Sequence, residues 1–224
     1  MCFNLTLSRV IGVAVLTVPR RLPVEMPFLS GLGLAGPAGL NAYIPLLVLA
    51  LADRASDKVT LAQPYDFISS TWFIFILLGL LLIEIIVDKI PGFDHANDLI
   101  QSVIRPASGA VLLMATTNDE NVINPVIAMI LGLGVAGGVH AVKTVSRPAV
   151  TISTGGLGNP IVSMLEDGIA VIISVLAILL PILAVILFIL LAVFIYYSYR
   201  TVGKLVRRAK GPPRSSTDPP TLRQ

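Results

Sequence analysis

The chain has 224 residues, of which 55% are hydrophobic and only 13% are charged, and its mean hydropathy is +0.87. Average soluble domains carry about 25% charged residues, so this composition excludes an ordinary soluble protein and predicts a polytopic membrane protein. The net charge of +3 does not indicate nucleic-acid binding, because seven of the sixteen basic residues are gathered after Tyr199. Cys2 is the only cysteine, which excludes an intramolecular disulfide.

Residues 1–26 contain a short apolar stretch that is followed by Arg20 and Arg21. The stretch is too short to cross a membrane, and its charges lie on the wrong flank for a cleaved signal peptide. We therefore expect a lead-in to the membrane domain. It is either a cytoplasmic segment or sequence that precedes a true start at Met26.

The first apolar segment, residues 28–51, contains Gly31, Gly33, Gly36, Pro37, Gly39, Asn41 and Pro45. Glycine and proline at membrane depth need protein neighbours that satisfy the freed backbone groups. We expect this span to be packed inside a bundle rather than exposed to lipid.

Residues 71–87 form an apolar helix pattern with Trp72 at its start, a position that suits an interfacial anchor. The pattern ends in the acidic and basic residues Glu84, Asp88 and Lys89. Residues 92–105 are amphipathic and charged. Residues 106–116 are apolar but short, and they form either a re-entrant half-helix or the end of a span that begins near Leu99.

Asn124 and Pro125 indicate a helix start, since asparagine caps helices and proline fits the first turn. The span that follows, 125–142, carries four glycines that predict close helix contact. Residues 144–167 are polar and rich in glycine. The last apolar run, 168–197, is about 45 Å long as a helix, so it must tilt, kink at Pro181 or protrude from a core of roughly 30 Å.

These elements predict an all-α, polytopic transmembrane bundle of four to six segments, some of them broken or re-entrant. With four full spans, the segments around Pro106 and Gly155 dip in from opposite faces; with five, residues 99–116 cross. The membrane domain is expected at 27–199 and a disordered basic tail at 200–224. The positive-inside rule places this tail in the cytoplasm, and we expect a multi-pass protein of a bacterial inner membrane. The expected partner is the lipid bilayer, with homo-oligomerisation left open.

Several motifs together resemble an uncharacterised family of small bacterial integral membrane proteins, known as a domain of unknown function. They are Gly39-Leu-Asn-Ala-Tyr-Ile-Pro-Leu-Leu47, Glu84 with Asp88-Lys-Ile-Pro-Gly-Phe-Asp-His95, Arg105-Pro-Ala-Ser-Gly109, His140-Ala-Val-Lys143 with Arg147, and Thr154-Gly-Gly-Leu-Gly-Asn-Pro160 with Glu166-Asp167. The resemblance runs from about residue 29 to about residue 185. It implies a membrane location and a shared polar pattern, but no activity.

The polar residues beside the apolar runs are the candidates for function, because ionisable groups are costly at membrane depth. Glu84 and Asp88 lie four residues apart and share a helix face, as Asp94 and Asp98 would in a helix. We predict that these four acids form a cation-facing group, with Asn41 and Asn159 as contacts at helix breaks. The expected counter-charges are Lys89, Arg105, Lys143 and Arg147. The alternative is a structural charge network.

His95 and His140 are the only histidines and are weak candidates for a metal site. No cofactor is expected, and the sequence leans against an enzyme without excluding one: the two Arg-Pro-Ala stretches at 105–107 and 147–149 lack the lysine and histidine of membrane phosphatases. The glycine-rich stretch 154–160 lacks the lysine of a phosphate-binding loop. The repeated stretches instead allow two related half-bundles, as in many transporters.

The leading functional hypothesis is therefore a transporter or channel-like protein for an ion or a small polar solute. A rival hypothesis is a membrane scaffold or assembly factor, in which the same charges hold the helices in register. A third is a metal-dependent enzyme that modifies lipids.

Overall fold

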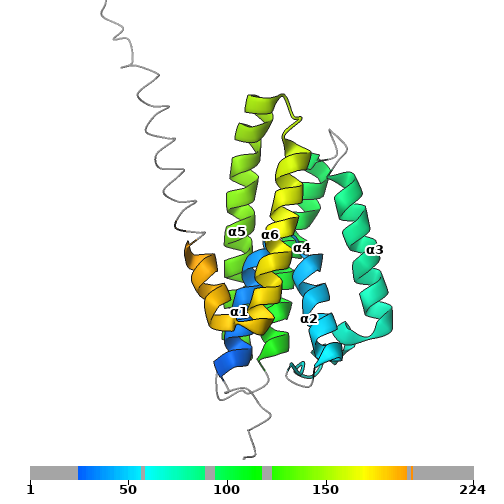
Figure 1. Cartoon of the computed structure of the whole chain (residues 1–224), viewed down its shortest axis with the longest axis vertical. Coiled ribbons are helices and arrows are strands. Elements are labelled where there is room, and N and C mark those ends of the chain that lie inside the picture. The colour runs from blue at the N-terminus through cyan, green and yellow to red at the C-terminus, as the bar shows by residue number, and fades with distance from the viewer. Residues whose placement is uncertain (1–24, 57–58, 89–93, 118–122, 191–192, 194–224) are drawn as a thin grey trace, which may run out of the picture.

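The computed structural model describes residues 25–56, 59–88, 94–117, 123–190 and 193 of the chain. This part is all-helical and forms one bundle (Figure 1). Its elements are α1 (Glu25–Ala38), α2 (Tyr43–Ala55), the 3-10 helix η1 (Tyr65–Ser69), α3 (Thr71–Val87), α4 (Asp94–Thr116), α5 (Pro125–Thr154) and α6 (Asn159–Leu179). A further helix, Pro181–Leu190, follows α6.

The bundle has the polarity of a membrane protein. Its outer surface exposes large apolar side chains such as Trp72 (82% exposed) and Ile152 (85%), whereas Arg105 is fully buried. Within the described residues, three helices are long and apolar enough to cross a membrane: Leu99–Thr116 of α4, together with α5 and α6. The prediction of an all-α transmembrane bundle with broken segments is confirmed.

The prediction of a single span over residues 28–51 is wrong in its detail, because the segment folds into the hairpin of α1 and α2. Backbone groups at Gly39, Leu40 and Asn41 bond back to Gly36 and Pro37, which closes a turn. The Asn41 side chain then starts α2 by accepting hydrogen bonds from the backbone of the next turn. Two short helices replace one long helix because the Asn41 side chain accepts hydrogen bonds from backbone N–H groups that a continuous helix would have paired with its own carbonyls.

The hairpin enters the bundle and returns to the end from which it came (Figure 1). Gly31 of α1 packs beside Thr116 at the end of α4. Gly39 belongs to the turn between α1 and α2, which we call the tip of the hairpin, and it packs beside Val139 in the middle of α5. After α2, the backbone of Ala62 bonds to Ala115, again at the end of α4. With 14 and 13 residues, α1 and α2 are each only about 20 Å long, so the hairpin stops inside the bundle.

The polar segment expected at 144–167 is mostly helical, because α5 continues through Thr154 and α6 begins at Asn159. Between them, Gly155 closes α5 in the left-handed conformation with φ 62°, which glycine adopts without steric cost. Residues around Gly155 therefore form a tight turn and not a re-entrant segment. Likewise, residues 106–116 are the second half of the continuous helix α4.

Of the three alternatives given for the last apolar run, the structure contains the break at Pro181. Helix α6 ends at Leu179, Leu180 leaves the helical conformation, and a new helix begins at Pro181. This helix turns back and lies beside α1 (Figure 1), where Ala184 approaches Gly33 and Phe188 approaches Gly36. The first residues up to Val24, Lys89 and the basic tail lie outside the described part of the chain.

Close packing of α4 against α5 depends on two glycines that face each other. A Cβ atom built on Gly109 would lie 2.5 Å from the carbonyl oxygen of Gly132, and one built on Gly132 would collide with the carbonyl oxygen of Gly109. The backbones touch, as in other membrane helix pairs with small residues at the interface.

We expect Gly132→Ala to destabilise the bundle by roughly 1–3 kcal/mol, because the added methyl group overpacks this contact. The matched control is Gly134→Ala on the same helix, where a Cβ meets nothing within 4 Å and alanine is the better helix former. Unfolding in detergent, followed by circular dichroism, should rank G132A below wild type and G134A at or above it. Equal stability of the two variants would contradict the packing.

Candidate functional site

The centre of the bundle holds an ion pair that joins α3 to α4. Arg105 Nη2 lies 2.8 Å from Glu84 Oε1, and the two side chains are 0% and 3% exposed. Removing one partner of such a buried pair leaves the charge of the other buried without compensation, so the stability contributed by each side chain depends on the other. The pair is therefore a structural link whatever else it does.

The same arginine reaches α5. Arg105 Nη1 lies 3.1 Å from His140 Nδ1, and His140 Nε2 lies 3.4 Å from the Thr144 hydroxyl. Because a guanidinium group only donates hydrogen bonds, Nδ1 of the histidine must accept, and the ring proton belongs on Nε2. Glu84, Arg105 and His140 thus form a continuous chain of hydrogen bonds across three helices, with the histidine neutral.

A second ion pair ties α5 to α6 and to the tip of the hairpin. Lys143 Nζ lies 2.7 Å from Glu166 Oε2 and donates a 3.0 Å hydrogen bond to the backbone carbonyl of Leu40. That carbonyl belongs to the turn between α1 and α2. One buried ammonium group therefore binds both a partly exposed carboxylate and the interrupted backbone.

Asn41 completes the attachment of the tip. Its side-chain oxygen caps α2 through Tyr43 and Ile44, while its side-chain nitrogen donates a 3.0 Å hydrogen bond to Asp167 of α6. The side chain is fully buried. The hairpin tip is thus held by two polar contacts, one from α5 and one from α6.

Asp88, directly after α3, is the third acid in an ion pair. It accepts a 2.9 Å hydrogen bond from Asn97, a bond from the Ser163 hydroxyl, and a longer 3.5 Å contact from Arg147. These partners come from α4, α6 and α5 respectively. Asp88 therefore joins the ends of four helices.

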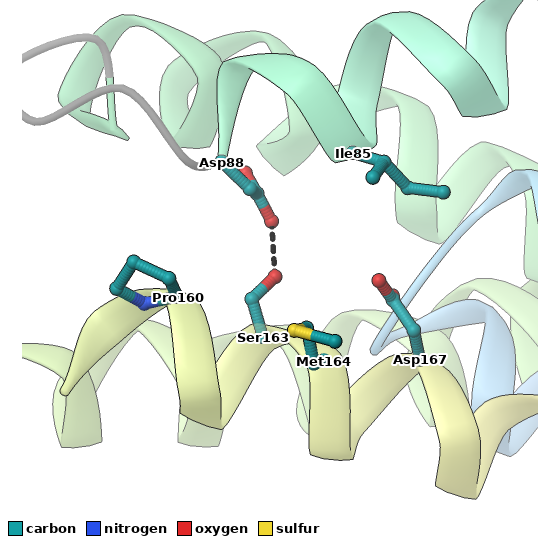
Figure 2. A pocket seen from close by; sticks show the side chains of 6 residues that line it. All are labelled: Ile85, Asp88, Pro160, Ser163, Met164 and Asp167. Atoms are coloured by element: carbon teal, nitrogen blue, oxygen red, sulfur yellow. Dashed lines mark hydrogen bonds between the residues drawn. The ribbon is translucent and has the colours of Figure 1, made fainter.

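A small pocket opens between α3 and α6 beside this carboxylate. Figure 2 shows Asp88 and Asp167 pointing from opposite sides into the same space, with Ser163 between them. The space open to the centre of a water molecule is about 10 Å³, close to the minimum that one water needs. The pocket is lined by Ile85, Asp88, Pro160, Ser163, Met164 and Asp167.

The ion pairs and hydrogen bonds described above form one polar network, with the acids Glu84, Asp88, Glu166 and Asp167 and the basic residues Arg105, Lys143 and Arg147. Asp167 differs from the other acids of this network. Glu84, Asp88 and Glu166 each have a basic partner within 4 Å, whereas among the described residues Asp167 has only the neutral Asn41. The described network thus contains four carboxylates and three basic side chains. Its surplus acid, Asp167, faces the pocket together with Asp88.

The structure brings together several of the residues predicted from the sequence. Glu84, Asp88, Asn41, Arg105, Lys143 and Arg147 all belong to the network. Asn159 lies elsewhere, at the turn from α5 to α6, where its side chain bonds to Thr151.

Lys89 and the side chains of Asp94, His95 and Asp98 lie outside the described residues. His140 is a partner of Arg105, and no group of three or more described His, Cys, Asp and Glu residues could hold a metal ion.

Several residues of the site were not among those predicted, and they include Asn97, Ser163, Glu166 and Asp167. The Glu166-Asp167 pair was noted in the family motif but was not assigned to the candidate pathway. Its position six and seven residues after Pro160 could have placed it on a helix inside the bundle.

Comparison with known families agrees with this picture. Residues 28–201 match the family described as a domain of unknown function, DUF4126. The chain belongs to this family. The resemblance drawn from the motifs is thereby confirmed, and the match spans the hairpin, the network and all the labelled helices from α2 to α6. No curated protein and no solved structure matches the chain.

The pair between Glu84 and Arg105 predicts a non-additive pattern of stability. We expect Arg105→Met to cost about 3–5 kcal/mol, because it leaves the Glu84 carboxylate buried without its counter-charge. The double variant E84Q/R105M should recover at least half of this loss, since it buries no orphan charge. Unfolding in detergent measures both; a double variant that is no more stable than R105M would contradict the pairing.

Proposed function

We propose that this membrane protein transports a small cation, or a small solute with a cationic group, through the interior of the bundle. The observation that carries the proposal is the position of Asp167: this carboxylate of α6 accepts a hydrogen bond from Asn41 at the hairpin tip, lies beside a pocket, and has no ion-pair partner among the described residues. An unpaired carboxylate inside a membrane bundle is costly unless a cation or a proton neutralises it. A transported cation supplies that neutralisation.

The helix break supports the same proposal. Many transporters place their binding sites near the middle of the membrane, at discontinuous helices whose freed backbone groups and neighbouring side chains contact the solute. Here the tip between α1 and α2 contacts Lys143 and Asp167 through Leu40 and Asn41. A hairpin held by a few polar contacts can exchange them for a solute without unfolding a complete span.

The proposed location is a bacterial inner membrane with the C-terminus in the cytoplasm. The support for this orientation is the basic tail after Tyr199, in which only Asp218 opposes seven basic residues.

The scaffold hypothesis is the second candidate, and the three ion pairs favour it. Two of them have N–O distances of 2.7 and 2.8 Å and little exposure, as expected of charges that hold helices together. The hydrogen bond from Asn41 to Asp167, however, needs only an acceptor oxygen, which an uncharged side chain would also supply, so a scaffold gains nothing from the negative charge of Asp167. This residue therefore separates the two hypotheses.

We expect Asp167→Asn to lower cation flux about tenfold or more, because the amide removes the charge that attracts the cation, and a tenfold loss corresponds to about 1.4 kcal/mol. Purified protein in liposomes would be tested with radioactive Na⁺ and Rb⁺ and with an internal pH-sensitive dye. The matched control is Asp66→Asn, since Asp66 is an exposed carboxylate of η1 outside the network.

The transport proposal fails if wild type gives no flux above empty liposomes for any of these probes, or if D167N transports as well as D66N. Loss of folded D167N protein together with absent wild-type flux would favour the scaffold. Size-exclusion chromatography before reconstitution distinguishes a folding defect from a transport defect.

A further inference from the structure

The pocket between α3 and α6 is about the size of a single water molecule. The space open to the centre of a water molecule is about 10 Å³, and one water needs roughly 10–15 Å³ by this measure. Its wall is partly apolar, since it includes the side chains of Ile85, Pro160 and Met164 (Figure 2). A hydrated ion does not fit into this space. An ion that enters must leave most of its water behind, and oxygen atoms of the protein must replace that water.

The polar side chains of the pocket supply such oxygen atoms. Asp167 accepts one hydrogen bond, from Asn41 to Oδ1, so most of its lone pairs remain open to a ligand among the described residues. The Ser163 hydroxyl donates its proton to Asp88, which leaves the hydroxyl oxygen as an acceptor. Carboxylate and hydroxyl oxygens are hard ligands, which suit hard cations rather than soft transition metals.

The charges around the pocket select the charge of the occupant. Arg147 lies 3.5 Å from Asp88, whereas no basic side chain among the described residues lies within 4 Å of Asp167. The other acids of the network also have basic partners, so Asp167 leaves one negative charge in surplus. A monovalent cation restores neutrality, whereas a divalent cation would leave an uncompensated positive charge inside the bundle.

The number of ligands agrees with a weakly held ion. Within the described part of the chain, no group of three or more His, Cys, Asp and Glu residues could hold a metal ion. Two carboxylates and one hydroxyl group do not make a tight site. A transported ion needs binding that is favourable enough for entry and weak enough for release.

We propose that the pocket binds one dehydrated monovalent cation of the size of Na⁺, with Asp167 as its main ligand and Asp88 and Ser163 as the other ligands. Na⁺ is smaller than a water molecule and fits the space, whereas Rb⁺ is larger than a water molecule. Ile85 then determines specificity, because its side chain limits the pocket from the α3 side. As the transported ion, this cation rests on the proposed function; its binding does not.

Thermal unfolding in detergent tests the binding without any transport. At equal ionic strength, Na⁺ should stabilise wild type relative to choline, with a half-saturating concentration about tenfold below that of Rb⁺, because a ligand of the folded state raises its stability. Asp167→Asn should lose this response, and Asp66→Asn, which changes an exposed carboxylate, should keep it. Equal stability of wild type in Na⁺, Rb⁺ and choline, or an unchanged response in folded D167N, would overturn the proposal.

A second pair of variants keeps the test decisive if D167N does not fold. Ile85 lines the pocket, whereas Ile86, the next residue of α3, is 58% exposed and does not line it. Ile85→Ala enlarges the pocket, so it should reduce the preference for Na⁺ over Rb⁺ about threefold or more. Ile86→Ala should keep the preference of wild type. Equal preferences in the two variants would overturn the assignment to this pocket.

Liposome flux separates this proposal from the transport proposal. Stabilisation by Na⁺ that depends on Asp167, without any cation flux, supports the binding site and contradicts transport. Flux that depends on Asp167 but carries Rb⁺ as well as Na⁺, or carries only protons, supports transport and contradicts the Na⁺ site.

Discussion

The structure depends on one constraint: inside a membrane bundle, every interrupted backbone group and every charge must find its partner within the protein. In this chain, polar groups at the helix break bind the charged side chains of the neighbouring helices, so that each supplies a partner for the other. The break between α1 and α2 frees the carbonyl of Leu40, and the buried ammonium group of Lys143 binds it. The same break is capped by Asn41, whose other side-chain atom satisfies the acid Asp167.

This arrangement requires the helices to approach closely. Contact of the α4 and α5 backbones at Gly109 and Gly132 brings Arg105 within hydrogen-bond distance of His140. Larger residues at the glycines would push the two helices apart and lengthen the 3.1 Å contact between Arg105 and His140. The small residues therefore serve the charge network as well as the packing.

Local signals in the sequence were sufficient for several features. The Asn124 cap, the break at Pro181 and the shared face of Glu84 and Asp88 follow from rules that involve only neighbouring residues, and the structure contains the cap and the break as predicted. Burial of Glu84 with Arg105 was also foreseeable, because opposite charges beside apolar runs have few other partners.

Features that depend on distant contacts were not foreseeable. Residues 28–51 have the length of a span, and only the contacts of the tip with α5 and α6 show that the chain reverses there. Residues 144–154 are polar enough to indicate a loop, but α5 is about 45 Å long and continues through them. The importance of Asp167 likewise follows from what it lacks, an ion-pair partner among the described residues, which no sequence pattern records.

The distribution of partners argues for a role beyond stability. Buried ion pairs are weak stabilisers, and apolar residues of similar volume often replace them at no loss. A network kept only for stability would be expected to pair every charge and satisfy every oxygen. This one retains an acid that has only an amide partner at the pocket, Asp167, and an unsatisfied carboxylate oxygen on Glu84. The Asp167 side chain bonds to Asn41 at the hairpin tip, so a change in the charge of this acid would act directly on the hairpin, which stops inside the bundle.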